Sequence, residues 1–263
     1  MTATSGFGLT GVSFAYGETP VLADLDISLQ PGKFYGIVGP NGCGKTTFLD
    51  LLTGGKSPDR GSVTFMDRPV ADYLRRDLAR LVALVPQDFA IDFAFTVQEV
   101  VLMGRHSHIG RFASPGTEDW RQVDAAMEAI GISHFRDRFV NELSGGEKQR
   151  VVVARALAQH TPYLLFDEAT SSLDVQYTMQ IFNVAKKLVQ EEGRTVIAVI
   201  HNLNLAAAYC DELIFMKKGK VAASGPTNTV LEPAMIKKVF GVESRVMFDE
   251  FSNTQQISFR YWS

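Results

Sequence analysis

The feature that most constrains this chain is a glycine-rich loop, GPNGCGKTT, at residues 39–47, which follows the apolar run FYGIV and precedes FLDLLTG. An apolar run, a glycine-rich turn and helical spacing, in that order, predict a strand, a loop and a helix. In this setting the pattern GxxxxGK(S/T) predicts a phosphate-binding loop; its fixed positions are Gly39, Gly44, Lys45 and Thr46. The alternative is a tight strand-to-helix turn that carries an exposed lysine.

Each residue type in this loop suits a nucleotide phosphate. Backbone N–H groups and the positive end of the following helix attract the β- and γ-phosphates, and glycines let the phosphates approach closely. Lys45 adds a compact positive charge, and Thr46 offers a hydroxyl group to Mg²⁺. The loop therefore predicts a bound nucleotide with its magnesium ion.

A second acidic element follows the apolar segment PYLLF, where Asp167 and Glu168 stand at the end of a predicted strand. Nucleotide-hydrolysing proteins with a phosphate loop need an aspartate there to hold Mg²⁺. Glu168, one residue further on, is placed to accept a proton from an attacking water or to orient that water. The alternative is a pair of acidic residues that only caps the following segment, and the phosphate loop argues against it.

The segment LSGGEKQR at residues 143–150 has two interpretations. Ser144 followed by Glu147 predicts a capping box at the start of a helix. Gly145 and Gly146 weaken a first helical turn without local benefit, so we expect a ligand to approach bare backbone N–H groups there. Because a helix N-terminus favours anions, the two interpretations are compatible.

The remaining pattern indicates an α/β fold. Residues 8–38 and the segments PYLLFDE, TVIAVIH and ELIFMKKG have strand character. Residues 88–160 are typical of a helical subdomain inserted between strands. A long helix is expected over residues 174–192, with an aspartate N-cap and a glycine at its C-terminal end. Strands that alternate with helices predict a mainly parallel sheet.

Composition excludes several classes of protein. At 263 residues and 46% hydrophobic content, the chain can bury a substantial core, and its net charge of −3 argues against a nucleic-acid partner. With Cys43 and Cys210 as its two cysteines, we expect no disulfide framework and a reducing compartment. We expect no signal peptide, and no apolar run reaches the roughly 20 residues of a membrane helix. Any membrane role would therefore depend on partner subunits.

These motifs together resemble the nucleotide-binding subunits of ABC transporters. GPNGCGKTT is similar to the family's phosphate loop, LLFDE to its metal-binding strand and catalytic glutamate, and LSGGE to its signature. The resemblance covers essentially the whole chain. It implies the P-loop NTPase fold of ABC ATPases, with N-terminal antiparallel strands, a mixed central sheet and an inserted helical subdomain. It also implies one domain over residues 1–263, ATP and Mg²⁺ as ligands, and ATP hydrolysis as the activity.

Four further residues align with the family in order. Tyr16 in FAYG resembles the aromatic residue that stacks on adenine, and Gln87 in VPQD resembles the Q-loop glutamine. Asp174, which ends SSLD, resembles the D-loop aspartate, and His201 resembles the switch histidine. The plainer alternatives are a half-buried strand aromatic for Tyr16, a polar strand end for Gln87 and a hydrogen-bonded strand-terminal histidine for His201.

The resemblance implies a full set of site residues. The implied catalytic residues are Glu168, His201 and Gln87, and the implied metal ligands are Thr46, Gln87 and Asp167. The implied nucleotide contacts are Tyr16, Gly39, Asn41, Gly42, Cys43, Gly44, Lys45, Thr46 and Thr47. The implied contacts from a second copy are Ser144, Gly145, Gly146, Glu147 and Asp174. The chain departs from the family at three positions, where Cys43, Ala169 and Asn202 replace the common serine, proline and aspartate.

The family resemblance also implies partners. One phosphate loop and one signature per chain imply a head-to-tail dimer with a second copy, which encloses two ATP molecules. The segments TVQEVVLMGRHSHIGRF and HNLNLAAAYCDELIFMKKGKVAASGPTNTVLEPAMIKKVFGVE resemble importer ATPases for iron-siderophore, haem and cobalamin uptake. The implied function is uptake driven from the cytoplasmic face of the membrane, through separate permease subunits and an extracytoplasmic substrate-binding protein. The alternative is a soluble ABC-type ATPase in metal-cluster assembly or another non-transport role.

Two segments leave alternatives open. Phe89, Phe93 and Phe95 stand beside the Q-loop, where the family docks a short helix of the membrane subunit. They would line a groove for an amphipathic helix or belong to ordinary core packing. The aromatic-rich tail, residues 243–263, is too short for an independent regulatory domain. It would form strands that close the sheet or a dimer contact.

Overall fold

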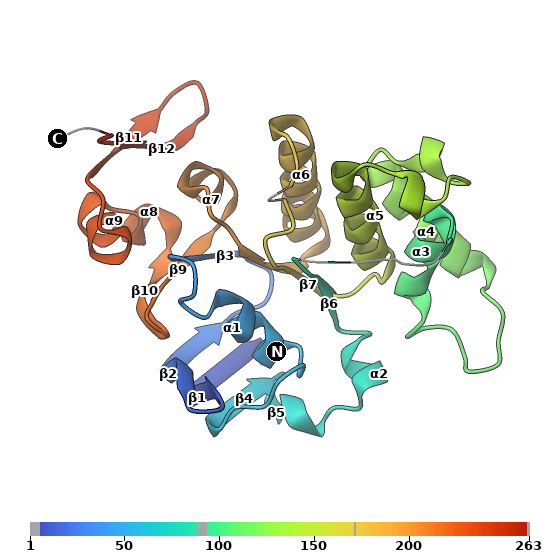
Figure 1. Cartoon of the computed structure of the whole chain (residues 1–263), viewed down its shortest axis with the longest axis horizontal. Coiled ribbons are helices and arrows are strands. Elements are labelled where there is room, and N and C mark those ends of the chain that lie inside the picture. The colour runs from blue at the N-terminus through green and yellow to red at the C-terminus, as the bar shows by residue number, and fades with distance from the viewer. Residues whose placement is uncertain (1–5, 88, 90–93, 171, 262–263) are drawn as a thin grey trace. The chain divides into compact units, whose positions relative to one another are not determined.

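The structure is a computed structural model with the mixed α/β organisation that the sequence predicts (Figure 1). It describes residues 6–87, 89, 94–170 and 172–261. The chain divides into two compact units. The first unit joins residues 1–73 to residues 197–263, and the second consists of residues 74–196.

The first unit begins with a four-stranded antiparallel sheet in the order β2-β1-β4-β5. Its strands are β1 (Phe7–Tyr16), β2 (Thr19–Leu29), β4 (Arg60–Phe65) and β5 (Arg68–Pro69). Apolar side chains from neighbouring strands pack together, as in the stacked rings of Phe7 and Phe65, whose centroids are 4.4 Å apart. The expected N-terminal antiparallel strands are thus confirmed.

A parallel pair of strands lies at the centre of the first unit. Strand β3 (Phe34–Val38) runs parallel to β9 (Glu212–Lys217), and β10 (Lys220–Pro226) returns antiparallel to β9. All five residues of β3 are buried, as expected for a strand covered on both faces. Strand β8 (Thr195–Val199) crosses the division between the units. Directly after it, the N–H of Ile200 donates to the carbonyl of Ile37, at 3.0 Å.

Helices and a terminal hairpin complete the first unit. The helical elements are α1 (Lys45–Leu52), the 3₁₀ turn η1 (Val70–Asp72), α7 (Leu203–Tyr209), α8 (Thr227–Val230) and α9 (Pro233–Phe240). The tail forms β11 (Ser244–Asp249) and β12 (Thr254–Phe259), which pair with each other in a separate two-stranded sheet. The tail therefore forms strands, but they do not extend the larger sheets. Helix α7 holds β12 through Asn204, whose Oδ1 accepts from the N–H of Ile257 at 2.7 Å.

The second unit contains the parallel strands β6 (Val82–Val85) and β7 (Tyr163–Phe166), with helices between and after them. The helices are α2 (Arg75–Leu78), α3 (Val97–Leu102), α4 (Thr117–Ala129), α5 (Gly145–Ala158) and α6 (Val175–Glu192). The 3₁₀ turns are η2 (Met103–Arg105), η3 (Ser133–Phe135) and η4 (Val140–Glu142). The helical insertion that the sequence predicts is therefore confirmed.

Helix α5 is the packing centre of this helical region, since both α3 and α4 contact it (Figure 1). The buried Arg105 secures its C-terminal end. The guanidinium of Arg105 pairs with Asp119 at 3.0 Å and donates to the carbonyl of Ala158 at 2.9 Å. That carbonyl lies in the last turn of α5, where carbonyl groups lack helical partners. The N-terminal end of α5 is consequently presented on a well-anchored helix.

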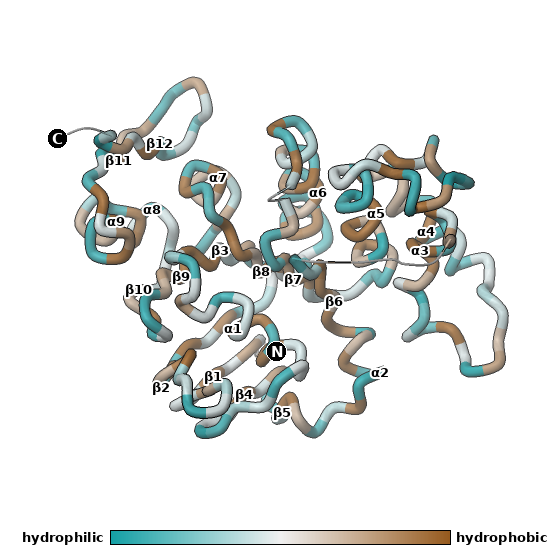
Figure 2. Tube along the Cα trace, in the orientation of Figure 1, coloured by the Kyte–Doolittle hydropathy of each residue, from teal (hydrophilic) through white to brown (hydrophobic). Residues whose placement is uncertain are grey.

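Helix α6 shows how closely the local sequence determines its ends. The carboxylate of Asp174 accepts from the N–H of Tyr177 at 3.0 Å, and Gly193 ends the helix with a φ of 65°. Hydrophobic and hydrophilic residues alternate in short stretches along α6 (Figure 2), as expected for a helix with one buried side. Among the described residues, no helix combines the length and apolar character needed to span a bilayer.

Candidate functional site

The glycine-rich loop connects β3 to α1 and begins the helix without a side-chain cap. Gly44 is the N-cap residue, with a φ of 101°. A Cβ atom at this position would lie 2.5 Å from Cδ2 of Leu22, so both the backbone angle and the packing require glycine. The side chain of Lys45 folds back over the loop, where its Nζ donates to the carbonyls of Gly39 (3.0 Å) and Pro40 (3.2 Å). The loop thus holds a 5% exposed cation against its own backbone.

The turn between β9 and β10 supports this loop from behind. The N–H of Gly219 donates to the carbonyl of Cys43 at 3.2 Å. Gly219 has a φ of 73°, and a Cβ atom there would lie 2.3 Å from the carbonyl oxygen of Val21. Any larger residue at position 219 would therefore clash with the backbone of β2 at Val21 and Leu22. The loop therefore accepts a backbone hydrogen bond from a residue outside it.

The thiol of Cys43 is buried at the back of the loop. The residue is 3% exposed, and its Sγ would lie 2.8 Å from a Cβ atom placed on Gly39. Burial raises the pKa of this thiol, and the positive charge of Lys45 opposes that rise. Thr47 is also buried, whereas Asn41, Gly42 and Thr46 are exposed. One side of the loop, with Asn41, Gly42 and Thr46, is thus exposed to solvent, and the other side, with Cys43 and Thr47, is packed into the protein.

Tyr16, at the end of β1, is 50% exposed. Phe14 contacts it edge-on, with ring centroids 5.0 Å apart, and Nζ of Lys56 lies 4.9 Å from the centre of its ring. A hydrogen bond with the Tyr16 hydroxyl raises the pKa of Lys56. Tyr16 is therefore a strand-end aromatic side chain whose ring is held by Phe14 and Lys56 and is half exposed to solvent.

In the second unit, the acidic pair directly follows β7. Asp167 is 5% exposed, and its N–H donates to the carbonyl of Val85 at 2.9 Å. Glu168 has a φ of 51°, a left-handed angle that is uncommon outside glycine. Nε2 of Gln87 donates to Oε2 of Glu168 at 3.1 Å. The structure thus brings together Gln87 and Glu168, which are 81 residues apart in sequence.

The signature segment forms the capping box that its sequence predicts, at the N-terminus of α5. The N–H and hydroxyl of Ser144 each donate to Oε2 of Glu147 at 2.7 Å. These two hydrogen bonds, with the hydroxyl as the first cause, lower the pKa of Glu147. Ser144 and Gly145 are exposed, and a Cβ atom at Gly145 would have no atom within 4 Å. The backbone of α5 at Gly145 thus has open space beside it.

The two remaining predicted residues lie next to helix ends. Asp174 caps α6, as described above. His201 follows β8, is exposed, and stands directly before Asn202, the N-cap of α7. Oδ1 of Asn202 accepts from the N–H groups of Asn204 (2.9 Å) and Leu205 (3.3 Å). An asparagine at position 202 therefore caps the helix as the family's common aspartate would.

The predicted residues form two groups, one in each unit. The first unit contains Tyr16, residues 39–47 and His201. The second unit contains Gln87, residues 144–147, Asp167, Glu168 and Asp174.

Sequence analysis missed two residues of α5 in the second unit. Nε2 of Gln149 donates to the carbonyl of Ala169 at 2.9 Å, and the guanidinium of Arg155 lies 4.0 Å from the centre of the Phe89 ring. The available signal was the presence of these polar residues among the apolar positions of the helix. Phe89 is partly buried and contacts Arg155. This contact favours ordinary packing over a docking groove as the role of Phe89. Phe93, which we also considered for docking, lies outside the described residues.

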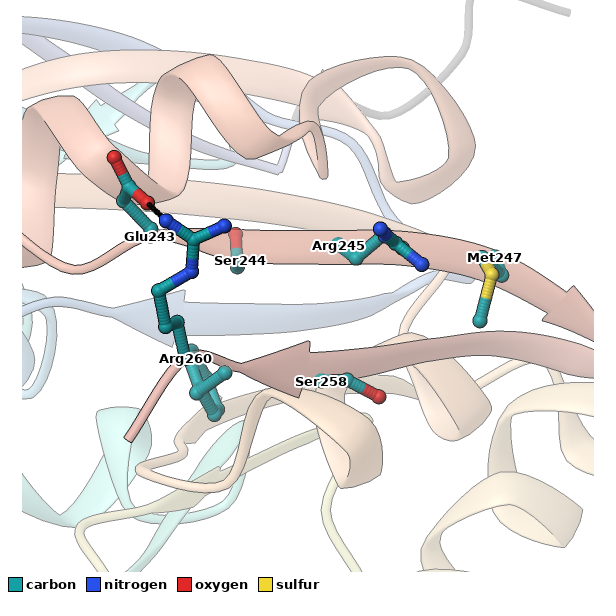
Figure 3. Close-up of a pocket in the computed structure, with 7 residues that line it drawn as sticks. Glu243, Ser244, Arg245, Met247, Ser258 and Arg260 are labelled. Atoms are coloured by element: carbon teal, nitrogen blue, oxygen red, sulfur yellow. Dashed lines mark ion pairs between the residues drawn. The ribbon is translucent and has the colours of Figure 1, made fainter. Parts of the chain in front are cut away.

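A separate pocket lies along the terminal hairpin (Figure 3). It has a volume of about 360 Å³ and is lined from both β11 and β12. Arg260, directly after β12, forms an ion pair with Glu243 at 2.7 Å, and the side chains of Arg245 and Met247 line the pocket from β11. None of the predicted nucleotide contacts lines this pocket.

The residues present are chemically suited to magnesium and nucleotide. Among the residues that the structure describes, no cluster of three or more His, Cys, Asp or Glu side chains surrounds a metal site. Mg²⁺ does not need such a cluster, because it is usually held by one or two protein oxygens together with substrate phosphates and water. The hydroxyl of Thr46 and the carboxylate of Asp167 are oxygen ligands of this kind. The open backbone at Gly42 leaves room for a phosphate beside the loop.

Comparison with known proteins gives consistent relatives. Residues 22–171 match the model of the ABC transporter family. A cobalamin import ATP-binding protein of Halobacterium salinarum is 43% identical over 242 residues, which cover 92% of this chain and 60% of that protein. A hemin import ATP-binding protein of Thermobifida fusca is 38% identical over 93% of this chain and 86% of its own length. The ferric enterobactin transport ATP-binding protein of Escherichia coli is 34% identical over 92% of this chain and 90% of its own length.

The share of a relative's length that this chain spans differs from one relative to another. It spans 60% of the Halobacterium proteins and 55% of an ABC transporter ATP-binding protein of Bacillus subtilis.

Solved structures agree with the family match. A chain from an inward-facing ABC transporter, assigned to the metal-chelate type, is 27% identical with a TM-score of 0.84, over 98% of both chains. A dimeric ATP-binding cassette bound to ADP and phosphate is 29% identical with a TM-score of 0.75, over 84% of this chain and 98% of that one. The sequence match, the motifs and the fold lead to one conclusion: this chain belongs to the ABC transporter family.

Proposed function

We propose that this chain is the ATP-hydrolysing subunit of an ABC importer for iron-siderophore, haem or cobalamin. The observation that carries the hydrolytic part is the hydrogen bond from Gln87 to Glu168, directly after the buried Asp167. A carboxylate held in this way, at the end of a strand that ends in an aspartate, suits a group that orients water. The cargo part rests on relatives that are named for cobalamin, hemin and ferric enterobactin import.

The loop residues bind the nucleotide in this proposal. Lys45 exchanges its carbonyl partners for the β- and γ-phosphates, while the backbone of residues 39–44 and the N-terminus of α1 donate hydrogen bonds. Tyr16 stacks on the adenine ring through its exposed face. Thr46 and Asp167 would hold Mg²⁺, with Gln87 as a further ligand. When bound, Mg²⁺ neutralises charge on the phosphates.

Hydrolysis depends on positioning, because phosphoryl transfer needs little covalent help from the protein. Glu168 orients the attacking water and accepts its proton. The amide of Gln87 restrains the carboxylate before ATP arrives. His201 completes the catalytic set as a hydrogen-bonding group toward the γ-phosphate.

The signature segment serves a second copy of the chain. Ser144 and Gly145 are exposed, and the N-terminus of α5 offers backbone N–H groups to an anion. With Gly146, Glu147 and Asp174, they would contact ATP bound to the partner's phosphate loop in a head-to-tail homodimer. Closure around ATP and release after hydrolysis would then act as the switch that drives transport.

The remaining partners follow from the importer assignment. We propose separate integral membrane permease subunits, an extracytoplasmic substrate-binding protein, and a location at the cytoplasmic face of the cell membrane. We also propose that residues 1–263 form one ABC ATPase domain, with residues 88–160 as its helical subdomain and residues 243–263 as a short tail.

Two experiments test these proposals in turn. The purified chain should hydrolyse ATP in the presence of Mg²⁺, and Lys45→Ala should abolish that activity, whereas Lys33→Ala, a change at a lysine outside the loop, should not. Equal activity of Lys45→Ala and wild type would contradict the nucleotide assignment. Purification from detergent-solubilised native membranes should recover a polytopic membrane protein at equal stoichiometry. Recovery with cluster-assembly proteins instead would support the non-transport alternative.

A further inference from the structure

The backbone at Glu168 requires support on both sides. Its φ of 51° lies in a region that residues with a side chain adopt only when the surrounding structure holds them there. On one side, the N–H of Asp167 donates to the carbonyl of Val85 in the adjacent strand, at 2.9 Å. That bond fixes the chain before Glu168. A second restraint is needed after it.

Gln149 supplies this second restraint. Its Nε2 donates to the carbonyl of Ala169 at 2.9 Å, in a buried contact, and the residue is 9% exposed. The carbonyl held by this hydrogen bond belongs to Ala169, the residue directly after Glu168. A buried amide that loses such a partner destabilises its surroundings more than an exposed one does. Gln149 thus limits how far the backbone after Glu168 can rotate.

Helix α5 is a firm base for this contact. Arg150, the next residue, places its guanidinium 3.9 Å from the centre of the Tyr177 ring on α6. A Cβ atom on Gly146 would lie 3.4 Å from Cδ2 of Leu173, so the first turn of α5 closely approaches the segment that follows Glu168. Gln149 therefore acts from a helix that packs against this segment at neighbouring points.

We propose that Gln149 is a positioning residue for Glu168, a role that rests on the proposed function of Glu168 in hydrolysis. Two glutamine amides share the task. Gln87 holds the carboxylate at 3.1 Å, and Gln149 holds the backbone one residue beyond it. Gln149 also belongs to the helix whose N-terminus we assign to the partner copy's ATP. The position of the water-orienting carboxylate is thereby tied to the placement of the signature helix.

The variant Gln149→Met tests this role, because methionine has a similar length but donates no hydrogen bond. We expect kcat for ATP hydrolysis to fall about tenfold, with the Kd for ATP within about twofold of wild type. Gln122→Met is the matched control. Gln122 is 7% exposed and donates to Glu118 on its own helix α4, at 2.8 Å. That variant also loses a hydrogen bond from a buried glutamine, and its kcat should stay at the wild-type value.

Epistasis with Glu168 separates positioning from general damage. In a Glu168→Gln background, Gln149→Met should cause no further loss of the residual activity, because its effect passes through the missing carboxylate. An unchanged kcat in Gln149→Met, or the same fractional loss in both backgrounds, would overturn the proposal. If the methionine variant does not fold, Gln149→Asn, whose shorter amide cannot reach Ala169, is measured in the same way. Absence of activity in the wild type would instead overturn the proposed function.

Discussion

The guanidinium carbon of Arg155 lies 4.0 Å from the centre of the Phe89 ring, two residues after Gln87. Burial lowers the pKa of Arg155, and a desolvated cation interacts more strongly with an aromatic face than an exposed one does. A planar guanidinium also stacks on a ring, which a lysine ammonium does not. The contact joins helix α5 to Phe89.

We expect Arg155→Lys to lower the free energy of unfolding by about 1–2 kcal/mol, measured by urea denaturation. In a double-mutant cycle with Phe89→Leu, the coupling energy should be about 1 kcal/mol. The control is Arg138→Lys, because the exposed Arg138 lies 5.1 Å from the ring of Phe135. A coupling energy of zero would mean that Arg155 and Phe89 are only neighbours.

Glu168→Gln should bind ATP and Mg²⁺ but hydrolyse ATP at least about a hundredfold more slowly. A neutral amide keeps a hydrogen-bonding group but cannot accept a proton. We expect the variant to accumulate as an ATP-bound closed dimer, visible by size-exclusion chromatography with ATP and absent with ADP. Glu142→Gln, at an exposed carboxylate of the same unit, is the control. Normal turnover of Glu168→Gln would remove Glu168 from its proposed role.

Alkylation of Cys43 should be slow at pH 7 and should accelerate as the pH rises. Burial raises the pKa of the Cys43 thiol, so less of the reactive thiolate is present at neutral pH than for an ordinary cysteine. Because Cys210 is the other free thiol of the chain, the measurement uses the Cys210→Ser variant, in which labelling reports on Cys43 alone. Mass spectrometry follows the labelling. Labelling should stop ATP hydrolysis, and bound ATP should protect the thiol. A rate that is independent of pH or of ATP would contradict this prediction.

Ser144→Ala should lower the free energy of unfolding by about 1 kcal/mol, the usual contribution of an N-cap residue, and should also reduce ATP hydrolysis. Thr96→Ala is the matched control, because Thr96 and Glu99 form the same capping box on α3. It should reduce stability to a similar extent and leave hydrolysis intact. Equal effects of both variants on hydrolysis would argue that Ser144 acts only as a cap.

The stability difference caused by Ser144→Ala should also depend on pH. The hydroxyl and N–H of Ser144 lower the pKa of Glu147 in the folded protein. The contribution of this contact is therefore complete above the unfolded pKa of about 4.3 and is lost as the pH falls through the lower folded value. Urea denaturation of both proteins between about pH 7 and pH 3, a range that spans the unfolded pKa, measures the change. A difference that stays constant over this range would contradict the prediction.

Tyr16→Ala should weaken ATP binding about tenfold, whereas Tyr16→Phe should bind ATP with nearly wild-type affinity, because stacking needs only the ring. Fluorescence or calorimetric titration gives the Kd values. Tyr261→Ala removes another exposed tyrosine and should have no effect. Equal weakening by the alanine and phenylalanine variants would assign the role to the hydroxyl group instead.

Local chemistry explains why much of the fold could be predicted. The N-cap Asp174 and the C-terminal Gly193 mark the ends of α6. Asp174 accepts a hydrogen bond from a free N–H group of the first turn, and Gly193 adopts the left-handed angle that ends the helix. The glycine loop likewise has a composition that few other structures require. Packing decided the features that were missed, such as the pairing of β11 with β12 in a sheet of their own. Nothing in their sequence distinguishes that pairing from an extension of the larger sheet.

The candidate site divides in the same way. Asp167 and Glu168 could be predicted because their position after an apolar strand is visible in sequence. The contact from Gln149 to Ala169 could not, because it depends on how α5 packs against the segment after β7. The left-handed φ of Glu168 was also hidden, since glutamate has no local preference for that angle. The motifs thus pointed to the candidate reactive groups, and the structure shows which contacts hold their backbone and side chains.

The turn at Gly219 has a consequence for genetics. A selection for loss-of-function alleles would be expected to return substitutions at this codon, although residue 219 belongs to no nucleotide motif. Its N–H supports the Cys43 carbonyl, and its missing side chain leaves room for the backbone of Val21. Such alleles would resemble mutations of the phosphate loop in phenotype. A clinical or environmental survey that scores only the motifs would overlook them.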